Sequence, residues 1–284
     1  MKLLRFGPAG QEKPGVLDTQ GRVRDLSAVV SDIAGSVLLP EGLARLRGLE
    51  LDDLPLVEGV PQQDLRLGPC VGQVGKCICI GLNYADHAAE SGMPVPPEPV
   101  VFNKWTSALC GPDDVVQIPR GSLKTDWEVE LAVVIGQGGR YISENEAMNH
   151  VAGYCVMNDV SERDFQLNRS GTWDKGKGCD TFGPLGPWLV TADEVPDPHN
   201  LSLWLEVDGQ RMQDGNTATM VYKVPFLIGY LSQFMSLQPG DVISTGTPPG
   251  VGMGHKPPVF LRAGQTMRLS VQGLGQQLQK VLQA

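Results

Sequence analysis

Two acidic residues stand at alternate positions of a predicted strand. The segment DWEVELAVVIG, residues 126–136, contains Glu128 and Glu130. Because successive strand side chains point to opposite faces, both carboxylates lie on one face, where they repel unless water or a cation separates them. The same face turns apolar at Ala132 and Val134. This change favours the mouth of a pocket, and a solvated second face is the alternative.

A third acid follows the next predicted strand. In GYCVMNDVSERDFQ, residues 153–166, Asp159 ends an apolar run and precedes a predicted helix. Asp159 could cap that helix, although Ser161 is equally placed. If Asp159 does not cap it, three carboxylates form an all-oxygen site, typical of Mg²⁺ or Mn²⁺. No Cys/His spacing indicates zinc.

A histidine and an acid share one face of an earlier predicted helix. In NYADHAAES, His87 and Glu90 are three residues apart, as in ordinary surface pairs. The functional alternative is a general base, with Glu90 orienting the imidazole. A Pro-rich stretch at 94–99 follows, so a loop tethers this helix, as in a lid.

Further polar residues could contact a ligand. Arg163 and Gln166 share one helical face, and Lys177 lies with Lys175 in the Gly-rich segment KGKG. We expect that segment to be a loop whose flexible backbone can approach a ligand closely. Thr247 lies in STGTPPGVGMG, residues 244–254, where hydroxyls and amides could hold a carboxylate. Each of these residues could also be an ordinary surface side chain.

The elements that must position these residues are mostly short strands. We expect helices near 84–91, 143–149, 161–168 and 222–235, and strands at 77–82, 100–103, 127–135, 151–158, 186–191, 201–208, 241–244 and 266–271. This order is not a βαβ alternation, so we predict an α+β, mostly β fold: a β-sandwich or rolled barrel with peripheral helices. A Pro/Gly-rich connection divides a small domain, 1–70, from the main domain, 71–284.

Composition excludes several classes of protein. The 284 residues carry 23 Lys and Arg against 32 Asp and Glu, a net charge of −9, which disfavours nucleic acid as a partner. No apolar stretch is long enough to span a membrane, and no signal peptide is evident, which indicates a cytoplasmic protein. The six cysteines form no C-x-x-C pair. We expect buried thiols without disulfides, and only Cys179, in the Gly-rich segment, is a candidate for reactivity.

At this point the residues resemble a known family. GLNYADHAAE, EVELAVVIG, GYCVMNDVSERDFQ, KGKGCDTFGPLGPW and GDVISTGTPPGVG look like successive motifs of the fumarylacetoacetate hydrolase superfamily, over residues 72–271. The resemblance implies a mixed β-sandwich roll with a small N-terminal α/β domain, usually a homodimer. It implies Mg²⁺ or Mn²⁺ on Glu128, Glu130 and Asp159. His87, Glu90 and Lys177 would be catalytic, and the substrate-binding set would be Arg163, Gln166, Thr247 and Lys104.

The resemblance also implies a reaction. The substrate would be a small anionic 2,4-dioxo acid, hydrolysed at its C3–C4 bond. Within the superfamily the motifs are most similar to bacterial L-2,4-diketo-3-deoxyrhamnonate hydrolases of sugar breakdown, which form pyruvate and L-lactate. Fumarylpyruvate and other acylpyruvate hydrolases, and oxaloacetate decarboxylases, are alternatives; a non-catalytic metal-binding module is an alternative of another class. Some acylpyruvate-cleaving relatives carry Arg where this chain has Leu82, so their substrates do not transfer directly.

Overall fold

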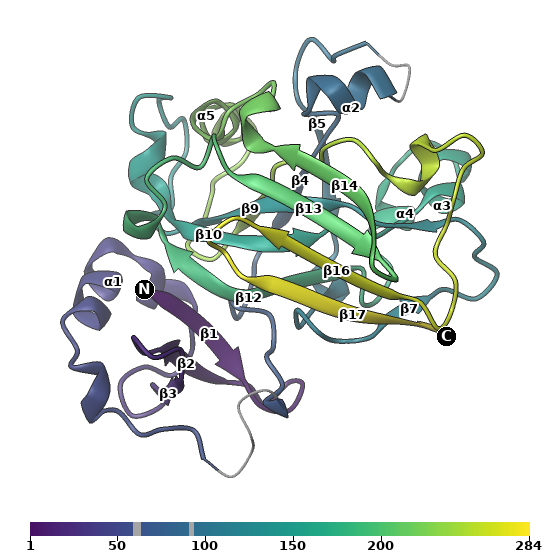
Figure 1. Ribbon diagram of the computed structural model, residues 1–284. Helices are drawn as coiled ribbons and strands as arrows, with labels where there is room; N and C mark the ends of the chain where they lie inside the picture. Colours follow the sequence, from purple (N-terminus) through teal and green to yellow (C-terminus); the bar gives the residue numbers. More distant parts are fainter. Residues whose placement is uncertain (59–63, 91–93) are drawn as a thin grey trace.

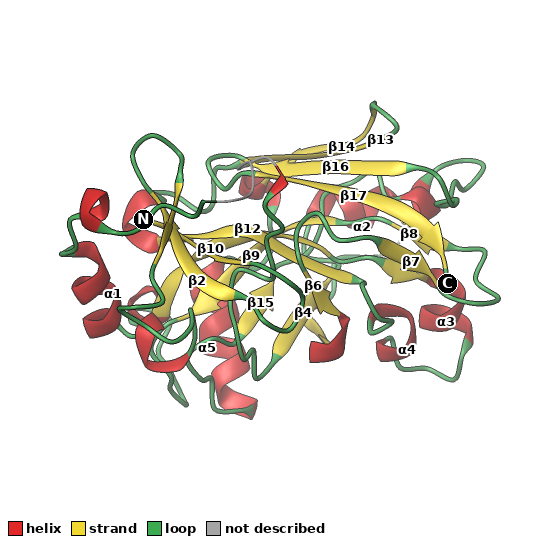
Figure 2. Ribbon diagram, turned by 90° about the horizontal axis from the view of Figure 1, so that it is seen from below, coloured by secondary structure: helices red, strands yellow, loops and turns green. Residues whose placement is uncertain are grey.

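The computed structural model describes residues 1–58, 64–90 and 94–284, leaving aside the side chains of 87–89. Two main sheets and a two-stranded ribbon dominate it, and most helices are short (Figures 1 and 2). This confirms the α+β, mostly β class. Over the described residues neither main sheet closes on itself, so the architecture is the sandwich and not the rolled barrel.

The larger sheet carries the acidic residues. Its spatial order is β3 (Val23–Asp25), β2 (Lys13–Leu17), β1 (Lys2–Phe6), β12 (Gly183–Thr191), β10 (Val151–Asn158), β9 (Val129–Ile135), β15 (Val242–Ser244), β4 (Cys77–Gly81) and β5 (Val100–Lys104), with β6 (Leu109–Cys110) beside β12. All of the strands expected from the sequence are present, within a few residues at their ends.

The smaller sheet stacks on the larger one (Figure 2). Its order is β14 (Gln210–Asn216), β13 (Ser202–Val207), β16 (Thr266–Val271), β17 (Gln276–Gln283) and β7 (Val116–Ile118). The ribbon pairs β8 (Thr125–Asp126) with β11 (Ser161–Glu162). Asp126 therefore belongs to the ribbon, and Glu128 lies between the ribbon and β9.

Both faces of β9 are buried. Val129, Leu131 and Val133 join the core that contains Leu203 and Leu269 of the smaller sheet. Ala132 and Val134 face a second core, shared with residues of the N-terminal segment. The expected alternation is confirmed, and the alternative of a solvated second face is wrong. A strand covered on both sides is mostly apolar, so the two acids at its start need a specific reason to be there.

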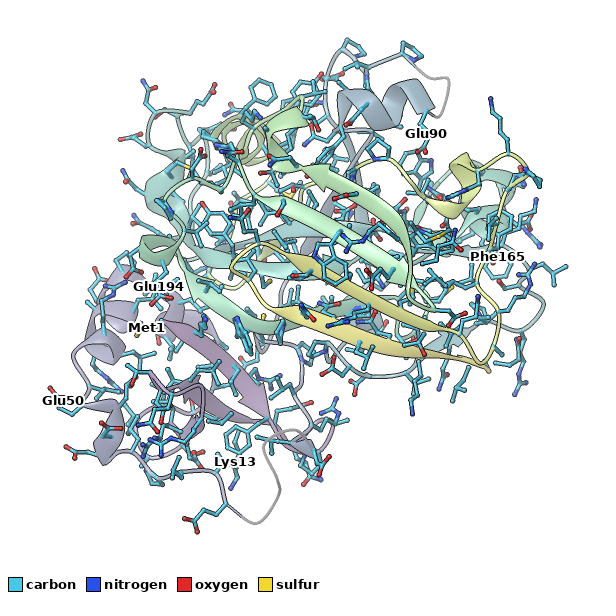
Figure 3. The ribbon with its side chains drawn as sticks, in the orientation of Figure 1. Met1, Lys13, Glu50, Glu90, Phe165 and Glu194 are labelled. Carbon is cyan, nitrogen blue, oxygen red and sulfur yellow. The ribbon has the colours of Figure 1, made fainter. Side chains whose placement is uncertain are left out.

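The N-terminal residues extend the larger sheet. β1 pairs antiparallel with β12, and β2 and β3 form a hairpin whose turn includes Gly21, with φ +76°. The N-terminal ammonium of Met1 pairs with Glu194 at 2.7 Å (Figure 3). The division of the chain at residue 70 stays a prediction.

The helices depart from expectation at three places. The structure has α1 (Pro40–Arg47), α2 (Ala85–Glu90), α3 (Arg163–Asn168), α4 (Asp174–Lys177) and α5 (Val224–Phe234). The helix predicted at 143–149 is wrong, since only a 3₁₀ turn at Ala147–His150 forms there. The helix predicted from residue 161 starts at Arg163, because Ser161 and Glu162 pair with β8. The loop predicted around Lys175 and Lys177 contains α4.

The cap of α3 is neither of the residues expected. The Glu162 carboxylate accepts a hydrogen bond from the Asp164 backbone amide at 3.0 Å, so Glu162 is the N-cap. Asp159 is therefore free of capping, which was the condition for its joining the acidic pair. The Ser161 hydroxyl instead donates to the Asp159 carbonyl at 2.9 Å.

Two expectations from composition, on the cysteines and on membrane-spanning helices, can be compared with the structure. All six cysteines are free thiols, four of them buried. Cys179 is partly buried, and burial raises the pKa of its thiol, which disfavours the reactive thiolate. Among the described residues, no helix has both the length and the apolar character needed to cross a membrane.

Candidate metal centre

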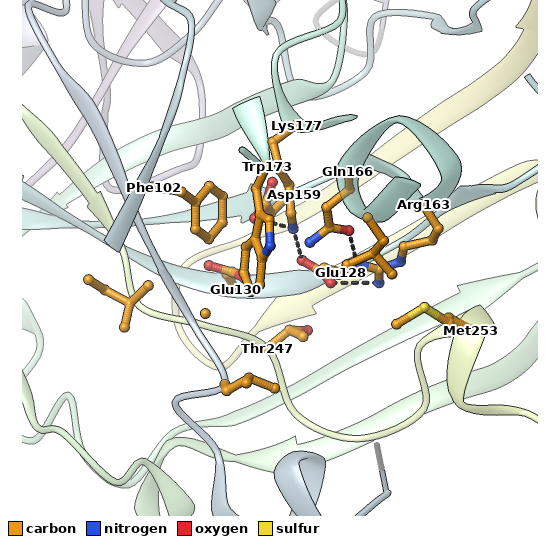
Figure 4. Close-up of a pocket in the computed structure, with 14 residues that line it drawn as sticks. Phe102, Glu128, Glu130, Asp159, Arg163, Gln166, Trp173, Lys177, Thr247 and Met253 are labelled. Carbon is orange, nitrogen blue, oxygen red and sulfur yellow. Dashed lines mark hydrogen bonds and ion pairs between the residues drawn. The ribbon is translucent and has the colours of Figure 1, made fainter. Parts of the chain in front are cut away.

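Three carboxylates converge at the adjacent ends of β9 and β10 (Figure 4). The strands are antiparallel neighbours with Asn158 opposite Val129, so Asp159 lies beside Glu128, and its amide donates to the Glu128 carbonyl at 2.9 Å. One carboxylate oxygen from each of Glu128, Glu130 and Asp159 lies within 4.8 Å of the others, and all three residues are buried. The sequence-predicted ligands therefore form one cluster.

The donor set fits a divalent cation. Burial, followed by repulsion from Asp159 and Glu128, raises the pKa of Glu130 well above its ordinary value. The Ser244 hydroxyl, at 2.5 Å, and the Gly246 amide, at 2.9 Å, both donate to Glu130 Oε2. These bonds orient the carboxylate but do not offset the repulsion. Three carboxylate oxygens suit a hard cation such as Mg²⁺ or Mn²⁺, which would supply the missing positive charge.

Lys177 lies against two of the three carboxylates. Its ammonium donates to Glu128 Oε2 at 2.6 Å and to Asp159 Oδ2 at 2.8 Å, and it sits 4.9 Å from the centre of the Phe102 ring. Burial opposes its charge, but Asp159 and Glu128 outweigh burial and raise the pKa of Lys177. The ammonium is therefore a fixed positive charge within the site.

Glycine is required for α4 to carry Lys177 there. A Cβ on Gly176 would lie 2.4 Å from both the Gln166 amide nitrogen and the Glu162 carbonyl oxygen. The missing side chain allows α4 to pack closely on α3. This contact places Lys177 beside the acids.

Arg163 and Gln166 approach Glu128 from α3. Arg163 Nη2 donates to Glu128 Oε1 at 2.6 Å, and Nη1 donates to Gln166 Oε1 at 3.0 Å. Burial opposes the guanidinium charge, but Glu128 and Asp126 raise the pKa of Arg163. Both α3 residues line the cavity, so the structure brings them together with the acids.

Lys104, at the end of β5, contacts the back of the cluster. Its ammonium donates to Asp159 Oδ1 at 2.5 Å, and to the carbonyls of Val160 at 2.9 Å and Lys177 at 2.5 Å. An ammonium has three hydrogens, so protein acceptors use all of them. Lys104 is also not among the residues that line the cavity. Its place in the substrate-binding set stays a prediction, which this geometry does not favour.

The cavity in front of the acids encloses about 160 Å³. Much of its lining is apolar, formed by Ile80, Leu82, Phe102, Leu167, Trp173 and Met253. Leu82 has φ +54°, which is uncommon for a residue with a side chain. Gly81 leaves room for Trp173, whose ring would lie 2.5 Å from an added Cβ. The cavity thus combines a cluster of charged groups with a largely apolar lining.

Thr247 also lines the cavity. Its hydroxyl donates to the Val129 carbonyl at 2.9 Å and accepts a hydrogen bond from Gln213 Nε2 at 2.8 Å. The hydroxyl hydrogen is therefore already engaged within the protein. A substrate contact by Thr247 stays a prediction.

The two residues expected on a lid helix, His87 and Glu90, are described only in part. His87 lies in α2, and its side chain is outside the described part of the structure. Both oxygens of Glu90 accept from the Gly250 amide, at 3.0 and 3.1 Å. Figure 3 places Glu90 at the end of α2 that faces the loop at 250–254. Glu90 therefore contacts the Gly-rich loop, and its pairing with His87 stays a prediction.

One residue of the site was missed from the sequence. Asp126 is fully buried, and its Oδ2 accepts from Arg163 Nε at 2.8 Å. Asp126, Glu128 and Glu130 stand at alternate positions of DWEVE. The alternation that indicated the two glutamates therefore already included the aspartate.

Comparison with known proteins places the chain in a family. A family model described as fumarylacetoacetate (FAA) hydrolase C-terminal matches residues 76–282. A relative from Burkholderia orbicola (strain MC0-3), whose name assigns it provisionally as a hydrolase, is 67% identical over 285 residues, with both chains fully covered.

Solved structures agree with this match. Fumarylacetoacetate hydrolase from Exiguobacterium antarcticum is 34% identical with a TM-score of 0.84, and both chains are fully covered. Maleylpyruvate hydrolase from Sphingobium sp. SYK-6, solved with manganese(II) and pyruvate, is 31% identical with a TM-score of 0.82, again over both full chains. A 5-carboxymethyl-2-hydroxymuconate delta-isomerase from Mycobacterium smegmatis is 31% identical with a TM-score of 0.77, covering 100% of this chain and 99% of that one. The chain belongs to the fumarylacetoacetate hydrolase family.

Proposed function

We propose that this protein is a divalent-metal-dependent hydrolase that cleaves the C3–C4 bond of a 2,4-dioxo acid. The observation that carries the proposal is the convergence of Glu128, Glu130 and Asp159 within 4.8 Å, in a cavity that also contains the ammonium of Lys177. The similar maleylpyruvate hydrolase was solved with manganese(II) and pyruvate, which supports a dication and a pyruvate-forming reaction here.

The three carboxylates would hold the cation, which would supply Lewis-acid chemistry to the oxygens of a bound 2,4-dioxo acid. Lys177 adds a second positive charge next to Glu128 and Asp159. Negative charge grows on the pyruvate half of the substrate as the C–C bond breaks. Because the Lys177 ammonium is already fixed in a buried site, it stabilises that charge without reorganisation.

The bond-breaking step needs an activated water. In the proposed reaction, His87 accepts a proton from water, and the resulting hydroxide attacks the 4-carbonyl carbon. The C3–C4 bond then breaks, and its electron pair forms the enolate of pyruvate. Protonation at C3 gives pyruvate, and the acyl half leaves as a carboxylic acid.

The charges of the site favour a substrate with one carboxylate. The connected buried cluster contains four acids, Asp126, Glu128, Glu130 and Asp159, and three bases, Lys104, Arg163 and Lys177. One net negative charge remains, and a dication changes it to one net positive charge. A single carboxylate neutralises this excess, whereas a second carboxylate would add an unbalanced charge in a cavity whose lining is largely apolar, where burial of a charge is costly.

Within the 2,4-dioxo acids, this balance supports an uncharged acyl group. L-2,4-diketo-3-deoxyrhamnonate has a small neutral acyl group and would give pyruvate and L-lactate, so we propose it as the substrate. Fumarylpyruvate carries a second carboxylate and is the less favoured acylpyruvate. The homodimer and the cytoplasmic location remain proposals, and light scattering of the purified protein tests the first.

Two other readings share the metal centre. Oxaloacetate decarboxylation would use the same cation and Lys177 without attack by water, and the isomerase among the similar structures shows that this fold also carries non-hydrolytic enzymes. A non-catalytic metal-binding module is the third reading. A buried lysine beside the carboxylates, in an open cavity, argues against it, since structural sites are closed.

The test is a substrate panel with Mn²⁺ or Mg²⁺. Purified protein is incubated with L-2,4-diketo-3-deoxyrhamnonate, fumarylpyruvate and oxaloacetate, and pyruvate, the companion acid and CO₂ are measured. We expect equal amounts of pyruvate and L-lactate from the first compound and slower release from the second. CO₂ from oxaloacetate without cleavage of either acylpyruvate would favour the decarboxylase. No turnover of any compound would favour the binding module.

A further inference from the structure

Asp126 joins two parts of the protein that surround the cavity. Its Oδ2 accepts from Arg163 Nε at 2.8 Å and from the Met253 amide at 3.0 Å. Its Oδ1 accepts from the Gly252 amide at 2.6 Å and from the Trp127 amide at 2.8 Å. We propose that Asp126 is a positioning residue that couples the loop at 250–254 to the metal ligand Glu128. The inference rests on the proposed function only in requiring that Glu128 binds a cation.

The first half of the coupling runs through Arg163. Its guanidinium is shared between Asp126, at Nε, and Glu128, at Nη2. The Asp126 carboxylate balances part of the guanidinium charge at a point away from Glu128. Without that carboxylate the full positive charge of the guanidinium would act on Glu128 at 2.6 Å. Glu128 would then attract a cation less strongly.

The second half of the coupling runs through the loop. Gly252 lies so close to its surroundings that an added Cβ would be 2.0 Å from the Val259 carbonyl oxygen and 2.7 Å from Asp126 Oδ1. The next residue, Met253, lines the cavity. The Asp126 carboxylate therefore sets the position of one wall of the cavity.

The loop is held from its other side by the lid helix. Gly250 donates to both oxygens of Glu90, and an added Cβ on Gly254 would lie 2.7 Å from the Glu90 carboxyl carbon. Asp126, beside the metal centre, and Glu90, on α2, thus both accept hydrogen bonds from the same short loop. A shift of the loop away from Asp126 would alter the Glu90 contact as well.

A matched control exists far from the cavity. Asp18 is also buried, and it accepts from the amides of Gln20 and Arg22, each at 2.9 Å. Its Oδ2 accepts from Arg22 Nε at 2.8 Å and from Arg24 Nε at 3.0 Å. Asp18→Asn therefore removes a carboxylate of the same hydrogen-bonding character, in the N-terminal segment.

The experiment compares Mn²⁺ binding to metal-stripped wild type, Asp126→Asn and Asp18→Asn by calorimetry, with thermal unfolding as the measure of stability. Both variants should unfold at a lower temperature. We expect only Asp126→Asn to bind Mn²⁺ about tenfold more weakly, which is the low end of the effect for residues that partner metal ligands. In the same variant kcat should fall by a larger factor than KM rises. Wild-type affinity in Asp126→Asn would overturn the inference. Absence of Mn²⁺ binding in the wild type would instead overturn the proposed metal centre.

Two further variants separate coupling from general damage. In Asp126→Asn combined with Arg163→Gln, the competing guanidinium is gone, so Mn²⁺ affinity should partly recover; a further loss would contradict the coupling. Asp126→Glu keeps the charge and serves if Asp126→Asn does not fold. It should bind Mn²⁺ with an affinity within about threefold of wild type, a smaller loss than the tenfold at the low end for residues that partner metal ligands. Its kcat should fall, because the longer side chain displaces the loop. An unchanged kcat in Asp126→Glu would count against the inference.

Discussion

Lys104 and Asp159 form a fully buried ion pair, with the ammonium nitrogen 2.5 Å from the carboxylate oxygen. Lys104 approaches from β5 and Asp159 from the end of β10. The carbonyls of Val160 and Lys177 take the other hydrogens of the ammonium. Lys104 therefore fixes both a proposed metal ligand, Asp159, and the end of α4.

Replacement of Lys104 by Met should destabilise the fold. The change leaves Asp159 buried without one partner, and removing one side of a buried pair costs about 3–5 kcal/mol. Urea unfolding measures the loss. Lys76→Met is the control, because Lys76 pairs with Asp241 at 2.7 Å from a partly exposed position and should cost less. A stable Lys104→Met variant with a raised KM would instead support the substrate-binding role expected from the sequence.

Replacement of Lys177 by Ala should lower kcat more than it raises KM. The attraction between the ammonium and the substrate becomes strongest when negative charge develops on the pyruvate half. Removal of the ammonium therefore mainly destabilises the transition state. Removal of one such group costs roughly 10²–10³ in kcat. Steady-state kinetics measure the two constants. Lys175→Ala is the control on the same helix, since Lys175 is exposed and donates to the Arg169 carbonyl. A KM effect alone would remove Lys177 from the chemistry.

His199 should make stability depend on pH. Its Nε2 accepts from the Val224 amide at 3.1 Å, at the start of α5, and burial followed by Lys223 lowers the pKa of His199. The unfolded chain therefore binds this proton more readily than the folded protein does. The contribution of His199 is complete above about pH 6.5, the ordinary value, and is lost as the pH falls toward the lowered pKa.

Unfolding of wild type and His199→Gln, compared from pH 5 to 8, tests this effect. Glutamine can accept the same hydrogen bond but does not titrate, so the wild type should lose more stability than the variant on acidification. His150→Gln is the control for removing a histidine elsewhere. Parallel pH profiles for wild type and His199→Gln would contradict the assignment.

The sequence was sufficient for the acids but not for their surroundings. Glu128 and Glu130 follow from period-two spacing, and Asp159 follows from its place at a strand end. The partners of Lys104 depend on the approach of β5 and α4 to β10, which no local pattern encodes. Asp126 was visible in the same alternation, but two of its three amide donors, Gly252 and Met253, lie 126 and 127 residues away in the chain.

Local propensity also misled at α4. Gly176 makes the segment a poor helix by intrinsic preference, yet the missing side chain is what allows contact with α3. Tertiary packing therefore outweighed propensity at the point where Lys177 is positioned. The error at 143–149 has the opposite direction, because a helix was predicted there and only its last residues form a 3₁₀ turn.

The central claim is that Glu128, Glu130 and Asp159 bind one divalent cation. Calorimetric titration of metal-stripped protein with Mn²⁺ tests it, with Glu130→Gln as the variant and Glu206→Gln, a residue paired with Arg211 on the exposed side of β13, as the control. We predict that wild type and Glu206→Gln each bind one ion per chain. Glu130→Gln should bind Mn²⁺ at least about tenfold more weakly and have lower activity, because one ligand charge is lost. Equal Mn²⁺ affinity in all three proteins would contradict the account.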